Sequence, residues 1–392
     1  MAPIRAPGKP RSTGARRSPP CSKACTSIGS RRRTRRCGCR CNAPTGVGAA
    51  PWYSTVAARK AGPLGALIAL LLFCLPASAG EDEYWRLYQT RYIDGGRVLD
   101  TGNKGVSHSE GQGWGMLLAE ANGDRRTFDR LWSWTRRHLQ RRDLALFSWR
   151  YDPAASPPVQ DLNNATDGDL LIAWALLRAA QRWDAADYRN ASAKIRQAIA
   201  GRLIKEHAGL TVLLPGLQGF EQNGQLILNP SYLVMPAIRA FARADPGGGW
   251  QRLLDDSRSL LDRARFGTYR LPPDWLALGA DGTLEPAAAW PARFGFDAVR
   301  VPLYLAWDGE PLSSPRLAPF ADFWSCCEPL HAWVDLNSGK LSPYPGSVGV
   351  KAIAALLRGE EPVATPEQLA KEDYYSMSLL MLARLARKEG AP

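Results

Sequence analysis

The sequence predicts an all-α domain over residues 80–392 that carries a small β-hairpin insertion. Apolar residues recur at helical spacing in ten or more segments of this region. Only residues 211–228 change to short β runs around a turn. No repeat of 20–50 residues and no linker-like composition divides the region. We therefore expect one domain of helices paired in antiparallel hairpins.

The expected helices follow one another along the whole domain. They are 84–92, 109–122, 125–139, 170–183, 188–206, 232–244, 250–265, 297–307, 348–357 and 374–387. Asn122-Gly123 ends the second of them with a typical C-terminal stop signal. The β runs at 211–214 and 225–228 flank Asn223-Gly224, a strong turn signal. The long connections 268–296 and 308–347, rich in Pro and Trp, are expected to be loops.

The N-terminal segment has a different composition. Residues 1–60 hold 14 of the 50 Lys and Arg residues and no Asp or Glu, which leaves 36 basic and 37 acidic residues for 61–392. The net charge of +13 therefore does not indicate a nucleic-acid-binding domain, because the excess is confined to this segment. We interpret residues 1–56 as a non-native or disordered extension, produced by a start site placed too early.

A secretory signal peptide is expected at residues 57–79. Arg59-Lys60 precede an apolar run at 64–75, and Pro76-Ala77-Ser78-Ala79 follows it, which is the order of such peptides. The run is short for a membrane span, and an uncleaved N-terminal anchor is the alternative. Cleavage would leave a periplasmic or secreted domain without a stable membrane anchor.

Cysteine and histidine usage predicts neither a disulfide framework nor a metal site. Six of the eight cysteines precede the expected cleavage point, so only the adjacent pair Cys326-Cys327 remains. The four histidines are scattered without metal-ligand spacing. His108 lies beside Glu110 and has either a site-lining or a surface role. No metal and no other cofactor is expected.

One carboxylate lies at the opening of the second helix, in Ser109-Glu110-Gly111-Gln112-Gly113-Trp114-Gly115. Glycine inside a helix costs roughly 1 kcal/mol relative to alanine, so three at alternate positions indicate that another helix or a ligand approaches closely. A helix N-terminus lowers the pKa of a carboxyl group, whereas a general acid must keep its proton. Glu110 can therefore act as an acid only with desolvation against Trp114 and an ionised neighbour such as Asp167.

Two further carboxylates open apolar helices. Thr166 is a plausible N-cap, with Asp167 and Asp169 in the first helical turn. Helix capping accounts for one of these carboxylates, and either capping or a functional site explains the pair. Asp297 precedes Arg300 on the same helical face, where an N-cap with a local ion pair is the alternative to a site. The inner helices of a barrel of hairpins all begin at one end. We therefore expect Asp167, Asp297 and Glu110 to meet in one cleft.

The aromatic content favours a sugar ligand, because flat apolar rings stack on pyranose faces. Fourteen tryptophans are present, and those in or beside the motifs or in loops are Trp114, Trp149, Trp174, Trp275, Trp290 and Trp333. Core packing is the alternative. It is the better interpretation for the tryptophans on apolar helical faces, Trp132, Trp134 and Trp183.

Together these motifs resemble glycoside hydrolase family 8, in particular its secreted endoglucanases of bacterial cellulose synthesis systems. Four motifs carry the resemblance in the family's order across most of 81–392. They are Ser109-Glu110-Gly111-Gln112, Ala165-Thr166-Asp167-Gly168-Asp169 with the apolar helix after it, Asn229-Pro230-Ser231-Tyr232, and Phe296-Asp297-Ala298-Val299-Arg300. Tyr374-Tyr375 match an aromatic pair in the family's last inner helix.

The resemblance implies an (α/α)6 barrel of helical hairpins with a cleft across one end, and hydrolysis of β-1,4-glucan with inversion. It implies Glu110 as general acid, Asp297 as general base and Asp167 as the residue that positions and distorts the sugar. The substrate-binding residues expected from the motifs and the aromatic content are Trp114, Trp149, Trp174, Tyr232, Arg300 and Tyr374. Family members often have Tyr before the base where this chain has Phe296, so another group must orient Asp297 or its water.

We therefore expect a periplasmic or secreted endo-β-1,4-glucanase, a cellulase that trims nascent cellulose. Its expected partners are the β-1,4-glucan and the cellulose synthase machinery. The same scaffold acting on chitosan, xylan or mixed-linkage glucan is one alternative. A non-catalytic glucan-binding subunit is another, although a lectin needs no carboxylates placed in this way. The sequence has no G-x-S-x-G elbow and no P-loop, which argues against other chemistries.

Overall fold

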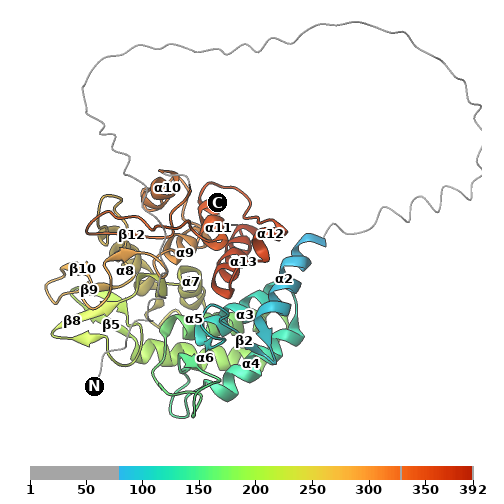
Figure 1. Cartoon of the computed structure of the whole chain (residues 1–392). Helices are drawn as coiled ribbons and strands as arrows, with labels where there is room; N and C mark the ends of the chain where they lie inside the picture. The colour runs from blue at the N-terminus through green and yellow to red at the C-terminus, as the bar shows by residue number, and fades with distance from the viewer. Residues whose placement is uncertain (1–78, 327–328, 391–392) are drawn as a thin grey trace, which may run out of the picture. The chain divides into compact units, whose positions relative to one another are not determined.

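The computed structural model describes residues 79–326 and 329–390, and within them six helices form a closed inner barrel (Figure 1). Each inner helix contacts the next along the chain, and the last contacts the first. The inner helices are α3 (Ser109–Ala121), α5 (Thr166–Arg182), α7 (Met235–Ala244), α9 (Arg300–Trp307), α11 (Val348–Leu357) and α13 (Tyr374–Lys388). This arrangement confirms the predicted (α/α)6 barrel. The expected extension and signal peptide lie outside the described residues, except for Ala79.

The outer helices cover the inner barrel. They are α2 (Ala79–Tyr92), α4 (Arg125–His138), α6 (Ala186–Arg202), α8 (Trp250–Arg263), α10 (Ala318–Ser325) and α12 (Pro366–Leu369). α4, α6 and α8 each pack on the inner helix that precedes them, which makes the predicted antiparallel hairpins. Burial separates the two layers, since eleven of the 13 residues of α3 are buried and only five of the 14 in α4. In the described part of the chain, no helix is long and apolar enough to cross a membrane.

Short antiparallel strands lie in the connections. The two-stranded pairs are β1 (Ile93–Asp94) with β2 (Arg97–Val98), β3 (Ser107–His108) with β4 (Arg150–Tyr151), β5 (Ile204–His207) with β6 (Leu210–Leu213), and β11 (Arg293–Phe294) with β12 (Val334–Asp335). A four-stranded sheet has the order β10 (Leu284–Pro286), β9 (Leu276–Leu278), β8 (Gln225–Leu228) and β7 (Glu221–Gln222). The η1 turn (Pro230–Tyr232) leads from β8 into α7.

The predicted hairpin insertion is only partly correct. Both β runs are strands, but they are not partners, because β6 pairs with β5 and β8 pairs with β7 and β9. Ala208 and Gly209 have positive φ and close a two-residue hairpin, so residues 204–207 pair as a strand instead of continuing α6. Asn223-Gly224 joins β7 to β8 as predicted. The connections expected as loops contain α10, β9 and β10.

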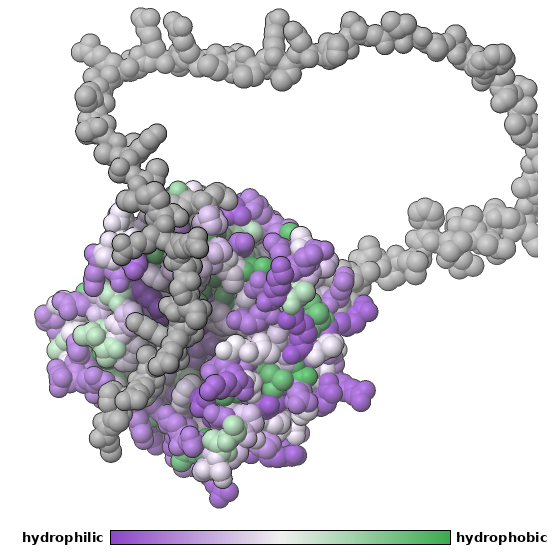
Figure 2. All heavy atoms as spheres, viewed as in Figure 1, coloured by the Kyte–Doolittle hydropathy of each residue, from purple (hydrophilic) through white to green (hydrophobic). Residues whose placement is uncertain are grey.

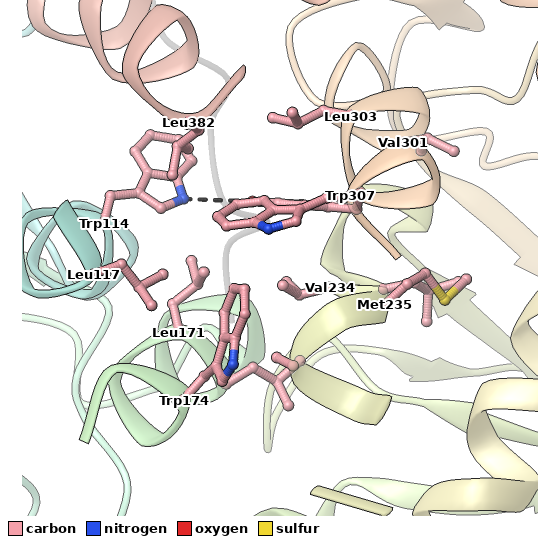
Figure 3. Close-up of a cluster of buried hydrophobic side chains, with 14 of the residues drawn as sticks. Trp114, Leu117, Leu171, Trp174, Val234, Met235, Val301, Leu303, Trp307 and Leu382 are labelled. Carbon is pink, nitrogen blue, oxygen red and sulfur yellow. Dashed lines mark hydrogen bonds between the residues drawn. The ribbon is translucent and has the colours of Figure 1, made fainter. Parts of the chain in front are cut away.

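Apolar side chains fill the inside of the barrel (Figure 3). The indoles of Trp174 and Trp307 lie 5.0 Å apart between their centroids, and Trp114 points inward from the opposite side. The Nε1 atom of Trp114 donates a hydrogen bond to the Tyr304 hydroxyl at 3.4 Å. These side chains fill the barrel from within, so a substrate cannot enter between the inner helices. The outer surface seen in Figure 2 is mostly hydrophilic, with small separate apolar patches.

The glycines of α3 face protein rather than open space. A Cβ on Gly113 would lie 2.5 Å from the Cβ of Leu171 in α5, and one on Gly115 would lie 2.8 Å from Val98. A Cβ on Gly111 would overlap the Tyr374 hydroxyl. Of the two explanations that the sequence left open, close approach of neighbouring elements is therefore the one observed.

Gly113→Ala is expected to lower the free energy of unfolding by about 1–3 kcal/mol, because the new methyl group forces α3 away from α5. The matched control is Gly201→Ala in α6, where a Cβ meets nothing within 4 Å. That change should raise stability by up to about 1 kcal/mol through helix propensity. Urea denaturation of both variants measures the difference. Equal effects of the two substitutions would show that close helix approach at Gly113 is unimportant.

Candidate active site

Three carboxylates from separate parts of the chain meet around one guanidinium at the end of the barrel where α3, α5 and α9 begin. The Nη2 atom of Arg300 lies 3.2 Å from Glu110 Oε1, 3.2 Å from Asp297 Oδ1 and 3.7 Å from Asp167 Oδ2. Arg300 itself is buried and its guanidinium lies 5.8 Å from the indole of Trp114. The expected meeting of the three motifs in one place is therefore observed.

Glu110 is placed by the close approach of α3 and α5. A Cβ on Gly168 would lie 2.7 Å from the Glu110 main-chain nitrogen, so only glycine lets the two helix openings come this close. The preceding residue, Ser109, donates its main-chain N–H to the Trp149 carbonyl at 3.0 Å. The pairing of β3 with β4 continues this contact. The opening of α3 is thus attached to both the neighbouring helix and the Trp149 loop.

Asp167 lies in the first turn of α5, as predicted, but Thr166 is not the N-cap. Thr166 is the first helical residue, and Ala165 is the N-cap without a side-chain hydrogen bond. The Thr166 hydroxyl instead donates to the Leu214 carbonyl at 2.7 Å, which ties the helix opening to the chain after β6. The Gly168 N–H donates to Asp167 Oδ1 at 2.7 Å. This donor stabilises the anionic form of Asp167.

Asp297 does not start a helix. It lies in a turn three residues before α9 begins at Arg300, which corrects the predicted helix 297–307. Main-chain N–H groups of this turn donate to Asp274, a buried carboxylate that no motif marked. On the other side, the Tyr375 hydroxyl donates to the Phe296 carbonyl. Main-chain contacts therefore orient the turn, although Phe296 lacks the hydroxyl of the family's usual tyrosine.

The pKa shifts of the carboxyl groups differ, and they favour a different protonation state for each group. Burial raises the pKa of Glu110 well above its usual value, and the negative charges of Asp167 and Asp297 raise it further, against the lowering effect of Arg300. Burial raises the pKa of Asp167 to about 6. Among the described residues, none donates a hydrogen bond to Glu110 Oε1, whereas Asp167 receives the Gly168 N–H. Glu110 is therefore the group best suited to hold a proton.

The three carboxylates differ in their exposure to solvent. The side chain of Asp297 is 31% exposed, that of Glu110 is 18% exposed and that of Asp167 only 4%. Asp297 can thus meet a solvent water, and the partly exposed Glu110 can contact a bound ligand. Asp167 is accessible only from inside the cluster. This ordering suits one proton donor, one carboxylate open to water and one buried anion.

Tyr232 belongs to the same cluster. Burial raises the pKa of its phenol well above the usual value, and the charges of Asp167, Asp297 and Glu110 add to this shift. The phenol therefore keeps its proton and can donate a hydrogen bond. Its neighbour Ser231 accepts a hydrogen bond from Arg300 Nη2 at 2.8 Å.

The structure separates the aromatic candidates into core and rim. Trp114 and Trp174 are buried inside the barrel (Figure 3) and have no face open to a sugar, so their predicted stacking role is wrong. Burial excludes it because a pyranose would have to displace the packed core. Trp149 is only half-buried; its Nε1 donates to Asp161 at 2.9 Å and its indole stacks on the His108 ring.

The other rim aromatics come from the long connections. Trp290 stacks on Trp275 at 4.7 Å between ring centroids. The Nε1 atom of Trp333 donates to the Tyr344 hydroxyl at 2.9 Å. Phe296, 45% exposed, lines a pocket with Tyr344 beside the Asp297 turn. Sequence reasoning did not single out Phe296 or Tyr344 as surface aromatics, because exposure cannot be deduced from loop composition.

Two sequence candidates remain close to the cluster without joining it. Tyr374 is buried, and its hydroxyl has no hydrogen-bond partner among the described residues. Burial, with the Arg150 charge adding, lowers the pKa of His108 to about 4, so its ring is neutral. Within residues 79–326 and 329–390, no group of three or more His, Cys, Asp or Glu side chains is placed to hold a metal ion.

Comparison with known proteins agrees with this site. Residues 63–389 match the family described as Glycosyl hydrolases family 8. An endoglucanase of Cellulomonas uda is 42% identical over 304 residues, which cover 76% of this chain and 84% of that protein. A family 8 endoglucanase structure from Klebsiella pneumoniae has a TM-score of 0.75 at 42% identity, covering 79% of this chain and 99% of that one.

The structure of the endo-β-1,4-glucanase of Acetobacter xylinum has a TM-score of 0.74 at 41% identity, covering 79% of this chain and 98% of that one. The chain belongs to glycoside hydrolase family 8.

Proposed function

We propose that this chain is an endo-β-1,4-glucanase that hydrolyses cellulose with inversion at the anomeric carbon. The observation that carries the proposal is the cluster of Glu110, Asp167 and Asp297 around Arg300, at the end of the barrel where the inner helices α3, α5 and α9 begin. A sugar-binding protein without catalysis has no use for a buried carboxyl that keeps its proton. Relatives named endoglucanases at 42% identity support the substrate class.

Each carboxyl group has a separate role in the proposed reaction. Glu110 donates its proton to the glycosidic oxygen as the bond from that oxygen to the anomeric carbon breaks. A water attacks the anomeric carbon from the opposite face, and Asp297 takes the proton that this water loses. Asp167 stays anionic, holds the sugar at the cleavage point and favours its distorted ring. After product release, Glu110 regains a proton and Asp297 loses one.

The proposed sugar contacts use the rim and cluster residues. Trp149 offers a flat face whose orientation is fixed by Asp161 and His108. Tyr232 supplies a protonated phenol that can donate a hydrogen bond to the sugar. Arg300 places its Nη2 atom among the three carboxylates and balances their negative charge.

The proposed location is the periplasm or the outside of the cell. The n-region, apolar run and Ala-x-Ala order at residues 57–79 support export. We propose that the exported enzyme trims nascent cellulose and works beside the cellulose synthase machinery. A near-neutral charge over residues 61–392 is consistent with an uncharged polysaccharide as the substrate.

A reducing-sugar assay on carboxymethylcellulose, chitosan, xylan and mixed-linkage glucan tests the substrate class. Carboxymethylcellulose should be hydrolysed faster than chitosan and xylan. The Glu110→Gln protein, purified in the same way, controls for contaminating glucanase. Faster hydrolysis of chitosan or xylan would reassign the specificity, and glucan binding without any hydrolysis would indicate a binding subunit.

A further inference from the structure

Asp274 accepts several main-chain hydrogen bonds from the turn that carries Asp297. Its Oδ1 atom accepts hydrogen bonds from Gly295 N at 3.0 Å, Asp297 N at 3.1 Å and Ala298 N at 2.9 Å. Three main-chain donors on one carboxylate oxygen fix the direction of the turn. The Asp297 side chain lies 3.2 Å from Arg300 Nη2 and is 31% exposed.

The position of Asp274 is itself fixed from outside the turn. Its main-chain N–H donates to the Arg293 carbonyl at 2.8 Å, and its Oδ2 accepts from Arg293 Nε at 3.0 Å. Arg293 belongs to β11, which pairs with β12. The next residue, Trp275, stacks on Trp290. Asp274 is therefore held by a strand pair and an aromatic stack that do not belong to the Asp297 turn.

Gly295 makes this contact possible. A Cβ on Gly295 would lie 2.9 Å from Asp274 Oδ2 and 3.0 Å from Arg293 Nε, closer than real Cβ atoms tolerate without movement. Asp274 is only 5% exposed, so a substrate does not reach its carboxylate. It can influence a substrate only through the residues that it holds.

We propose that Asp274 is a positioning residue for the reaction, which holds the Asp297 turn so that the carboxylate of Asp297 faces the attacking water. The Tyr375 hydroxyl holds the same turn from the opposite side through the Phe296 carbonyl. Asp274 supplies what the missing hydroxyl at Phe296 cannot, a fixed direction for the base. The inference rests on the proposed roles of Asp297 and Glu110.

The test compares Asp274→Ala with Asp274→Asn on a defined cello-oligosaccharide. Asp274→Ala should lower kcat by about 100-fold, the loss associated with a misplacement of about 1 Å. KM should change less than about 3-fold, since nothing in the cleft is removed. Asp274→Asn keeps an oxygen facing the three N–H groups and should recover at least about tenfold of the loss.

The matched control is Asp281→Ala, which removes an exposed carboxylate from the same connection. Asp281 accepts a hydrogen bond from Thr283 N at 2.9 Å and caps only a surface turn. Its kcat and KM should equal those of the wild type. A folded Asp274→Ala protein with near-normal kcat would overturn the inference, and so would a loss confined to KM or an Asn variant no better than Ala.

If Asp274→Ala does not fold, Gly295→Ala tests the positioning role of Asp274 instead. Its new methyl group pushes on the carboxylate without removing it, so kcat should fall at least tenfold with KM unchanged. Wild-type kcat in a folded Gly295→Ala protein would overturn the inference. A wrong assignment of the base and a wrong positioning role for Asp274 give different results. If Asp297→Asn stays active, the base is misassigned, whereas an inactive Asp297→Asn beside an active Asp274→Ala rejects only the positioning role.

Discussion

Asp297→Asn is expected to lower turnover of β-1,4-glucan by about 10³-fold or more, because the amide cannot take a proton from the attacking water. The substitution is nearly isosteric, and the main-chain contacts that hold the turn remain. Binding of a cello-oligosaccharide should therefore stay near the wild-type affinity. Reducing-sugar release measures the first quantity, and isothermal titration calorimetry measures the second.

Asp322→Asn on the outer helix α10 is the matched control for this variant. Asp322 is exposed and lies outside the carboxylate cluster, so its loss of charge should leave kcat unchanged. Near-normal activity of Asp297→Asn would reject Asp297 as the base. Loss of both activity and binding, with the fold intact, would assign Asp297 to substrate binding.

Glu110→Gln is expected to lose about 10²–10⁴-fold in activity on cello-oligosaccharides, since no other group protonates the departing sugar oxygen. The loss should be much smaller on an aryl cello-oligosaccharide, whose leaving group departs without protonation. Initial rates on both substrates give the comparison. An equal loss on the two substrates would mean that Glu110 is not the acid.

The pH profile supplies a second result for the same variant. Burial raises the pKa of Glu110, and only its protonated form can donate, so wild-type kcat/KM should fall as the pH rises through that pKa. Glu110→Gln should lose this alkaline limb, because its amide does not titrate. Glu285→Gln on β10, an exposed carboxylate, should keep the wild-type profile. An alkaline limb that persists in Glu110→Gln would belong to another group.

The motifs predicted which residues meet, because the topology of a helical barrel sends helix openings to one end. Glu110 and Asp167 follow this rule directly, since each lies in the first turn of an inner helix. Asp297 follows it less closely, since it precedes α9 in a turn. The spacing to Arg300 nevertheless placed the carboxylate and guanidinium together.

Sequence patterns did not predict the contacts between residues far apart in the chain. Asp274 lies in a connection expected to be a loop, and its three donors come from residues 21–24 positions later. No local pattern marks such a contact. Burial of Trp114 and Trp174 was missed because an aromatic residue beside a catalytic motif fits either core or site. Only the closed barrel shows that these indoles fill its inside (Figure 3).

The separation between the acid and the base distinguishes inverting from retaining hydrolysis. Glu110 Oε1 and Asp297 Oδ1 each lie 3.2 Å from one arginine nitrogen, so these two oxygens are at most 6.4 Å apart. Carboxyl groups of retaining enzymes are roughly 5–5.5 Å apart and those of inverting enzymes roughly 6.5–9.5 Å. The 6.4 Å limit applies to one oxygen of each carboxyl group, and the anomeric form of the product reports directly whether a water acts between the groups.

Proton NMR of cello-oligosaccharide hydrolysis, recorded before mutarotation, measures that anomeric form directly. We expect the α-anomer to appear first at the new reducing end, because water displaces a β-linked sugar with Asp297 as base and Glu110 as acid. First appearance of the β-anomer would contradict it, since retention requires a carboxylate to attack the sugar itself.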